Sequence, residues 1–126
     1  MATIRMTGAT GDDDLRNDCH AIRRVFLKGS PTPRVFDPIL GGQLANTTFD
    51  VSKDIAGVSS PTDINSFEIE HVSVEQGAET RDNWDMDFVQ FQLIVPGSFP
   101  QVIAQAGVHR FTGNSAVLDV PVFPPS

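Results

Sequence analysis

Hydrophobic and polar residues alternate along several short stretches of the chain. The clearest stretch is residues 87–95, where one face would carry four apolar side chains: Val89, Phe91, Leu93 and Val95. Because successive side chains of a β-strand point to opposite faces, this alternation predicts a strand with one buried and one wet face. Just upstream, the apolar residues occupy even-numbered instead of odd-numbered positions, and would therefore point to the other face: Trp84, Met86 and Phe88. That change of phase predicts a β-bulge, or the end of a loop, near Met86.

Seven further segments are also predicted to be β-strands. Residues 67–74 alternate until His71, where a phase change predicts a second bulge. Residues 21–28 carry apolar side chains on both faces, which predicts a strand buried on both sides. The weaker predicted strands are residues 3–7, 34–36, 46–51, 102–106 and 116–122. Residues 60–65 are the single helical candidate, a short turn that Pro61 would open.

Short strands and scarce helix define the predicted fold class. About eight strands at spacings of roughly a dozen residues predict an all-β, antiparallel two-sheet β-sandwich with little or no helix. The chain contains no internal repeat or linker, so we expect residues 1–126 to form a single β-sandwich domain. The Pro-rich tail, residues 120–126, has too many prolines for a central strand, so we expect an edge strand, a contact arm or disorder there.

Composition and charge narrow the classes of function. With 126 residues, 40% of them hydrophobic, the chain can bury a core without disulfides, and its single Cys19 cannot form an internal one. The formal net charge of −7 repels phosphate backbones, which argues against nucleic acid as a partner. Neither a transmembrane segment nor a signal peptide is expected, because no apolar run is long enough to form one. The cellular location does not follow from this.

Acidic residues concentrate in two segments, and this concentration suggests a cation site. Half of the sixteen acidic residues lie there, in the order Asp12, Asp13, Asp14, Asp18, then Glu79, Asp82, Asp85 and Asp87. A hard cation such as calcium, which prefers oxygen ligands, would relieve the repulsion between these carboxylates. We therefore predict a calcium site with five carboxylate ligands: Asp12, Asp13, Asp14, Asp82 and Asp87. Alternatively, both segments are solvated loops in which Asp and Asn form turns.

The sequence Asn83-Trp84-Asp85 places the only Trp between polar residues at the start of the clearest strand. An exposed Trp there would stack on a sugar ring or enter a membrane interface, because its ring face is apolar and its N–H needs a partner. Arg110 precedes a predicted turn and is available to an acidic cluster. We predict a ligand-binding site at Asn83, Trp84, Asp85 and Arg110. The alternative is that Trp84 closes one end of the core.

Signals for catalysis are weak. Cys19 and His20 are adjacent, and in an extended chain their side chains would point to opposite faces. Asp85 and Asp87 could share a face, as a carboxylate pair for acid/base hydrolysis would, but no companion histidine is evident. The motifs of serine hydrolases, zinc proteases and phosphate-binding loops do not occur. We therefore predict a protein that is not an enzyme.

Two stretches carry a family resemblance. Residues 4–14 have the sequence IRMTGATGDDD, and residues 82–89 have the sequence DNWDMDFV. Both resemble motifs of the PLAT family, the lipoxygenase-homology β-sandwich modules named after polycystin, lipoxygenase and alpha-toxin. The resemblance implies a β-sandwich that binds lipid, with calcium near Gly8, Gly11 and Asp12 to Asp14. Residues 83–87 and 110–113 are also similar to bacterial β-sandwich modules appended to secreted hydrolases and toxins, which implies an adhesion or targeting role.

Together these features predict a non-catalytic module that recognises a glycan, as a lectin does, or a lipid surface, assisted by calcium. The alternative is a structural or assembly protein. In that case strand edges and the C-terminal tail would hold a homo-oligomer together.

Overall fold

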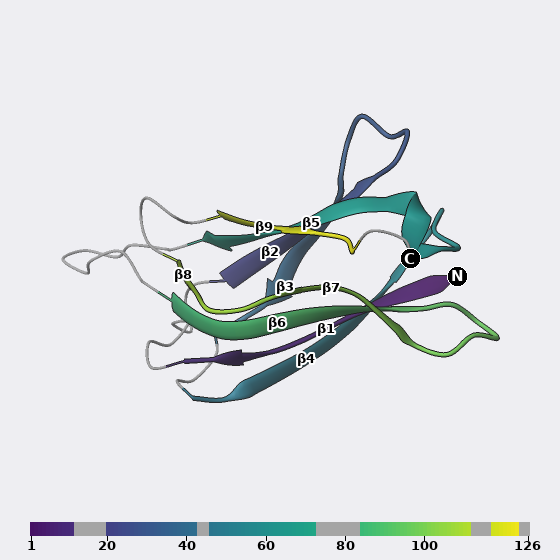
Figure 1. Ribbon diagram of the computed structural model, residues 1–126. Helices are drawn as coiled ribbons and strands as arrows, with labels where there is room; N and C mark the ends of the chain where they lie inside the picture. The colour runs from purple at the N-terminus through teal and green to yellow at the C-terminus, as the bar shows by residue number, and fades with distance from the viewer. Residues whose placement is uncertain (12–19, 43–45, 73–83, 112–116, 124–126) are drawn as a thin grey trace.

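The computed structural model describes residues 1–11, 20–42, 46–72, 84–111 and 117–123 (Figure 1). These residues form two antiparallel β-sheets packed against each other, which confirms the predicted all-β sandwich. The strands are β1 (Ala2–Thr10), β2 (His20–Leu27), β3 (Arg34–Leu40), β4 (Thr48–Ile55), β5 (Ile64–Val72), β6 (Trp84–Ile94), β7 (Gln101–Ala106), β8 (His109–Phe111) and β9 (Val117–Pro121).

The strand order gives the sandwich two distinct ends. One sheet has the order β4-β1-β6-β7, with β8 pairing the first residues of β6, and the other has the order β3-β2-β5-β9. At one end β1 finishes with Thr10 and β6 begins with Trp84, and we name this the Trp84 end. At the opposite end β6 finishes with Ile94 and β7 begins with Gln101, and we name this the hairpin end (Figure 1).

The predicted phase change near Met86 is a β-bulge in β6. Ala9 of β1 pairs with Phe88, whereas Thr10 pairs with Met86, so Asp87 is the additional residue on the bulged strand. The bulge lets β6 bury Trp84 and Met86 before it and Val89 after it. A strand without the bulge would have to expose one of these two sets, because its side chains alternate strictly between faces.

A pair of stacked phenylalanine rings lies in the core between the sheets. Phe67 of β5 and Phe91 of β6 are fully buried, with ring centroids 4.1 Å apart and planes within 4° of parallel. These two strands belong to different sheets. The stack therefore joins the sheets directly, and aliphatic side chains surround it, among them Ile4, Met6, Val25, Ile69, Val89 and Ile103.

The predicted bulge at His71 is wrong. β5 pairs with β2 in unbroken register at this point, with His71 opposite Ala21 and Val72 opposite His20. His71 is buried, and its ring packs near the rings of Trp84 and Phe111, so a residue counted as polar occupies a core position. The prediction that residues 21–28 are buried on both faces holds only in part, because Phe26 is half-buried on the outer face.

Two other local predictions are confirmed. A short 3-10 helix, η1 (Pro61–Asp63), begins after Ser60, whose hydroxyl accepts a hydrogen bond from the Thr62 N–H at 3.3 Å. The described part of the tail continues from edge strand β9, and the Phe123 N–H donates to the Ile103 carbonyl of β7 at 2.8 Å. The described part of the tail thus begins as an edge strand of one sheet and reaches a contact with the other at Phe123.

Arg23 is a buried cation in the inner face of β2. Its side chain is fully buried, and its three guanidinium nitrogens have no hydrogen-bond partner among the described residues. The guanidinium carbon lies 4.6 Å from the centre of the Phe36 ring, a cation–π contact. Burial disfavours the charged form and lowers the pKa of Arg23 to about 10. At neutral pH this charge therefore destabilises the fold.

We expect Arg23→Met to stabilise the protein by about 1–4 kcal/mol, because a buried charge is replaced by an apolar side chain. Arg24→Met is the matched control, since Arg24 lies on the outer face and pairs with Glu68 at 2.9 Å and Glu70 at 2.7 Å. The control should lower stability by at most about 1 kcal/mol. Urea unfolding at neutral pH measures both. A larger loss in Arg23→Met than in Arg24→Met would mean that the Arg23 charge has a stabilising partner.

Candidate functional site

Four of the predicted site residues lie in the described chain: Trp84, Asp85, Asp87 and Arg110. They come from β6 and β8 at the Trp84 end. The other predicted residues lie outside the described residues: Asp12, Asp13, Asp14, Asp82 and Asn83.

Trp84 fills the core at this end. Its side chain is fully buried, its ring stacks on Phe111 with centroids 5.0 Å apart, and its Nε1–H donates to the Thr10 hydroxyl at 3.2 Å. The indole N–H therefore has its partner inside the protein. In this structure the ring offers no surface to a sugar or a lipid, which corrects the expectation of an exposed Trp84 and agrees with the alternative, a core residue that closes one end.

Asp85 and Arg110 form an ion pair across β6 and β8. They are direct partners in the strand register, and Arg110 Nη1 lies 2.6 Å from Asp85 Oδ1. The Asp85 carbonyl also accepts a hydrogen bond from the Gly11 N–H at 2.8 Å. We expected Arg110 to be available to an acidic cluster, and the described partner from that cluster is Asp85. An anionic or polar ligand would have to share Arg110 with this carboxylate.

The bulge residue Asp87 lies beside Gly11. A β-carbon added at Gly11 would come within 2.5 Å of Asp87 Oδ1 and 3.3 Å of the Asp85 β-carbon. The fold therefore brings Asp85 and Asp87 next to the residue that immediately precedes Asp12. Among the described residues, no three His, Cys, Asp or Glu side chains gather as a metal site. The calcium site stays a prediction, because four of its five expected ligands lie outside the described residues.

The hairpin end carries an exposed aromatic residue. Phe99 lies between β6 and β7 and is 94% exposed. The connection turns sharply at Gly97, whose φ of +84° suits glycine, and the Ser98 N–H closes the turn on the Val95 carbonyl at 3.0 Å. Pro96 and Pro100 flank the turn and restrict its backbone. Phe99 is thus held in solvent at the tip of a restrained hairpin.

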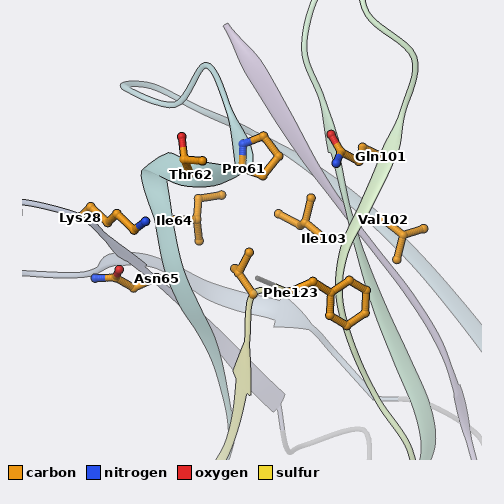
Figure 2. A pocket seen from close by; sticks show the side chains of 10 residues that line it. Lys28, Pro61, Thr62, Ile64, Asn65, Gln101, Val102, Ile103 and Phe123 are labelled. Atoms are coloured by element: carbon orange, nitrogen blue, oxygen red, sulfur yellow. The ribbon is translucent and has the colours of Figure 1, made fainter. Parts of the chain in front are cut away.

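A cavity of about 600 Å³ opens beside this hairpin, between β7 and the point where η1 is followed directly by β5 (Figure 2). Ile64 and Ile103 approach it from opposite sheets, and Val122 and Phe123 of the tail form a further wall. The backbone hydrogen bonds of the tail to Asn65 and Ile103 hold that wall in place. The floor is therefore aliphatic, and the polar side chains lie around its rim.

Among the described residues that line this cavity, Lys28 is the one cation. The Lys28 side chain extends toward Ile64 in Figure 2, and it makes no hydrogen bond or ion pair with the described residues. Asp63 is a nearby acid, but its carboxylate already accepts hydrogen bonds from the backbone N–H groups of Ser59 and Ser60. Those bonds, with a smaller contribution from the Lys28 charge, lower the pKa of Asp63 below its usual value.

Sequence reasoning missed both features of the hairpin end. Phe99 stands in the sequence Pro96-Gly97-Ser98-Phe99-Pro100, so an aromatic residue inside a strong turn signal was the clue. The cavity had no comparable clue. Its walls come from segments around residues 28, 61–65, 101–103 and 122–123, which only the sheet packing brings together.

Comparisons with known proteins support the fold. The crystal structure of a lipoxygenase variant is similar to this chain, with a TM-score of 0.63 and 15% sequence identity. The similarity covers 98% of this chain but only 17% of the lipoxygenase chain, so this chain spans about a sixth of that protein. It is consistent with a PLAT-like β-sandwich. No family model matches the chain, and no curated protein matches it.

In the part of the chain that the structure describes, no helix is long and apolar enough to cross a membrane.

The contact between Trp84 and Thr10 predicts a measurable loss of stability. Thr10→Val removes the hydroxyl acceptor and leaves the buried indole N–H without a partner, which should lower the free energy of unfolding by about 1–3 kcal/mol. Thr10→Ser keeps the acceptor and should cost less. Denaturant unfolding followed by the fluorescence of Trp84, the only Trp, measures both variants. Equal losses in the two would show that this hydrogen bond contributes nothing.

Proposed function

We propose that this chain is a non-catalytic module that binds a lipid surface with its hairpin end. The observation that carries the proposal is Phe99, 94% exposed at the tip of a restrained hairpin. A large apolar side chain held in water gains free energy when it enters an apolar phase, about 1.5–3 kcal/mol for complete burial. Because Pro96 and Pro100 restrict the loop, little further ordering is needed on binding.

Other exposed apolar side chains lie at the same end. Met1, next to the first residue of β1, is 74% exposed, and Phe123 of the tail is 45% exposed. With Phe99 they give this end three large apolar side chains in contact with solvent. Such a set favours insertion into the interface of a bilayer over contact with a sugar, which needs a flat aromatic face framed by hydrogen-bonding groups.

The structure of the Trp84 end favours lipid over glycan. The glycan alternative depended on an exposed Trp84, and that ring is buried. The assembly alternative invokes strand edges and the C-terminal tail, and the described tail residues make their backbone hydrogen bonds within the same chain. A lipid surface is also the ligand that the resemblance to PLAT modules implies.

Vesicle binding tests this proposal. Phe99→Ser should weaken partitioning onto phosphatidylcholine vesicles roughly tenfold, because it removes the side chain that inserts. Val108→Ser is the matched control, since Val108 is 80% exposed but follows β7 at its far end from the hairpin. Co-sedimentation with vesicles measures both variants. The proposal fails when the wild-type protein does not sediment with vesicles, or when both variants bind as it does.

We further propose that calcium, bound by Asp87 and the acidic segments, stabilises the fold without taking part in lipid binding. The reason is that Asp87 and Phe99 lie at opposite ends of the sandwich. A cation that binds only the folded form adds about 2.7 kcal/mol of stability at a hundredfold excess over its Kd.

Calcium should therefore raise the melting temperature by roughly 3–8 °C and leave vesicle binding unchanged. Asp87→Asn should reduce this rise. Asp50→Asn, which breaks an exposed ion pair with Arg5 on the outer sheet face, should leave the rise intact. Differential scanning calorimetry in calcium and in chelator measures the effect. Identical melting curves in both would mean that the acidic segments are only solvated loops.

A further inference from the structure

The cavity at the hairpin end is large enough to hold a small molecule. Its volume of about 600 Å³ falls within the roughly 300–1,000 Å³ that is typical of small-molecule sites. Ile64, from the start of β5, and Ile103, from β7, face it from the two sheets (Figure 2). Both are almost completely buried, so they close the inner end of the cavity, and the apolar surface open to a ligand comes from Val102, Val122 and Phe123.

The walls are held by the backbone as well as by side chains. The Val122 N–H donates to the Asn65 carbonyl at 3.4 Å, and the Phe123 N–H donates to the Ile103 carbonyl at 2.8 Å. The tail is thus attached to both sheets at the edge of the cavity. This attachment places the Phe123 ring, 45% exposed, where it can cover an apolar ligand.

The polar side chains of the rim include one that carries a positive charge. Lys28 lies at the rim, and its ammonium group has no hydrogen bond or ion pair with the described residues. The Asp63 carboxylate is bound to the Ser59 and Ser60 backbone and to the Ser59 hydroxyl, so it does not neutralise Lys28 by direct contact. The remaining polar side chains of the rim are neutral: Thr62, Asn65 and Gln101. Lys28 is therefore the cationic side chain that a negatively charged head group would contact, although its charge also acts on Asp63.

We propose that this cavity binds one molecule of a single-chain amphiphile with an anionic head, a fatty-acid carboxylate. The acyl chain lies against Val102, Val122 and Phe123, and the carboxylate lies at Lys28. Half-exposed apolar side chains beside a cation match this ligand better than a sugar, whose hydroxyls would need many buried partners. The site goes beyond attachment to a lipid surface, because it takes a lipid monomer from solution.

Decanoate, used below its micellar concentration, is the test ligand. We expect saturable binding to the wild-type protein with one-to-one stoichiometry by isothermal titration calorimetry. Amide shifts in NMR spectra should map to residues 64–65, 101–103 and 122–123. Decyltrimethylammonium has the same chain and a positive head, and it should bind more weakly. Absence of saturable decanoate binding, equal affinity for the two amphiphiles, or shifts that map to the Trp84 end would overturn the proposal.

Two variants separate the contributions of head and chain. Lys28→Gln should weaken decanoate binding roughly fivefold and leave decyltrimethylammonium binding no weaker than before. Phe123→Ala should weaken the binding of both amphiphiles by a similar factor, on the order of tenfold. Lys53→Gln is the control for charge, because Lys53 is an exposed β4 residue that does not line the cavity. An effect of Lys53→Gln equal to that of Lys28→Gln would overturn the assignment of Lys28.

The same variants separate this inference from the proposed function. Phe99→Ser should leave the affinity for decanoate unchanged, because Phe99 does not line the cavity. Decanoate binding without vesicle binding would reject the proposed function alone. Vesicle binding without decanoate binding would reject the cavity ligand alone.

Discussion

The stack of Phe67 on Phe91 is the contact on which the rest of the sandwich depends. Each sheet has one apolar face and is not stable by itself, so the two faces must cover each other. The stacked rings join a central strand of one sheet to a central strand of the other and fix which residues of β5 and β6 point inward. Once Phe91 points inward, Trp84 can do so only because the bulge at Asp87 changes the phase of β6.

The two ends of the sandwich differ because different side chains meet between the sheets. At the Trp84 end, the aromatic rings of Trp84 and Phe111 stack and fill the space, and the indole N–H is satisfied by Thr10. At the hairpin end, the facing side chains are the smaller Ile64 and Ile103, and a cavity remains. The most exposed large apolar side chain among the described residues, Phe99, thus lies at the end where the core is incompletely filled, and this is the end to which we assign lipid.

Hydrophobic periodicity was sufficient to predict the fold, and its one clear error has a physical cause. The bulge at Asp87 was predictable because apolar residues mark both phases of β6, whereas the bulge predicted at His71 was wrong because a buried histidine was counted as polar. The ion pair of Arg110 with Asp85 followed from the excess of acid nearby. Trp84 could not be assigned to core or surface from its polar neighbours. The cavity depends on packing between distant segments, and no local pattern encodes that.

The orientation of the protein on a membrane tests the central claim most directly. The measurement is the line broadening of backbone amide signals when the protein binds phosphatidylcholine vesicles that contain a spin-labelled lipid. The account predicts strong broadening for residues 97–99 of the hairpin and for Phe123, and little for Gly11, Trp84 and Asp87. Broadening that is strongest at Gly11 and Asp87 would place the Trp84 end on the lipid and contradict the account.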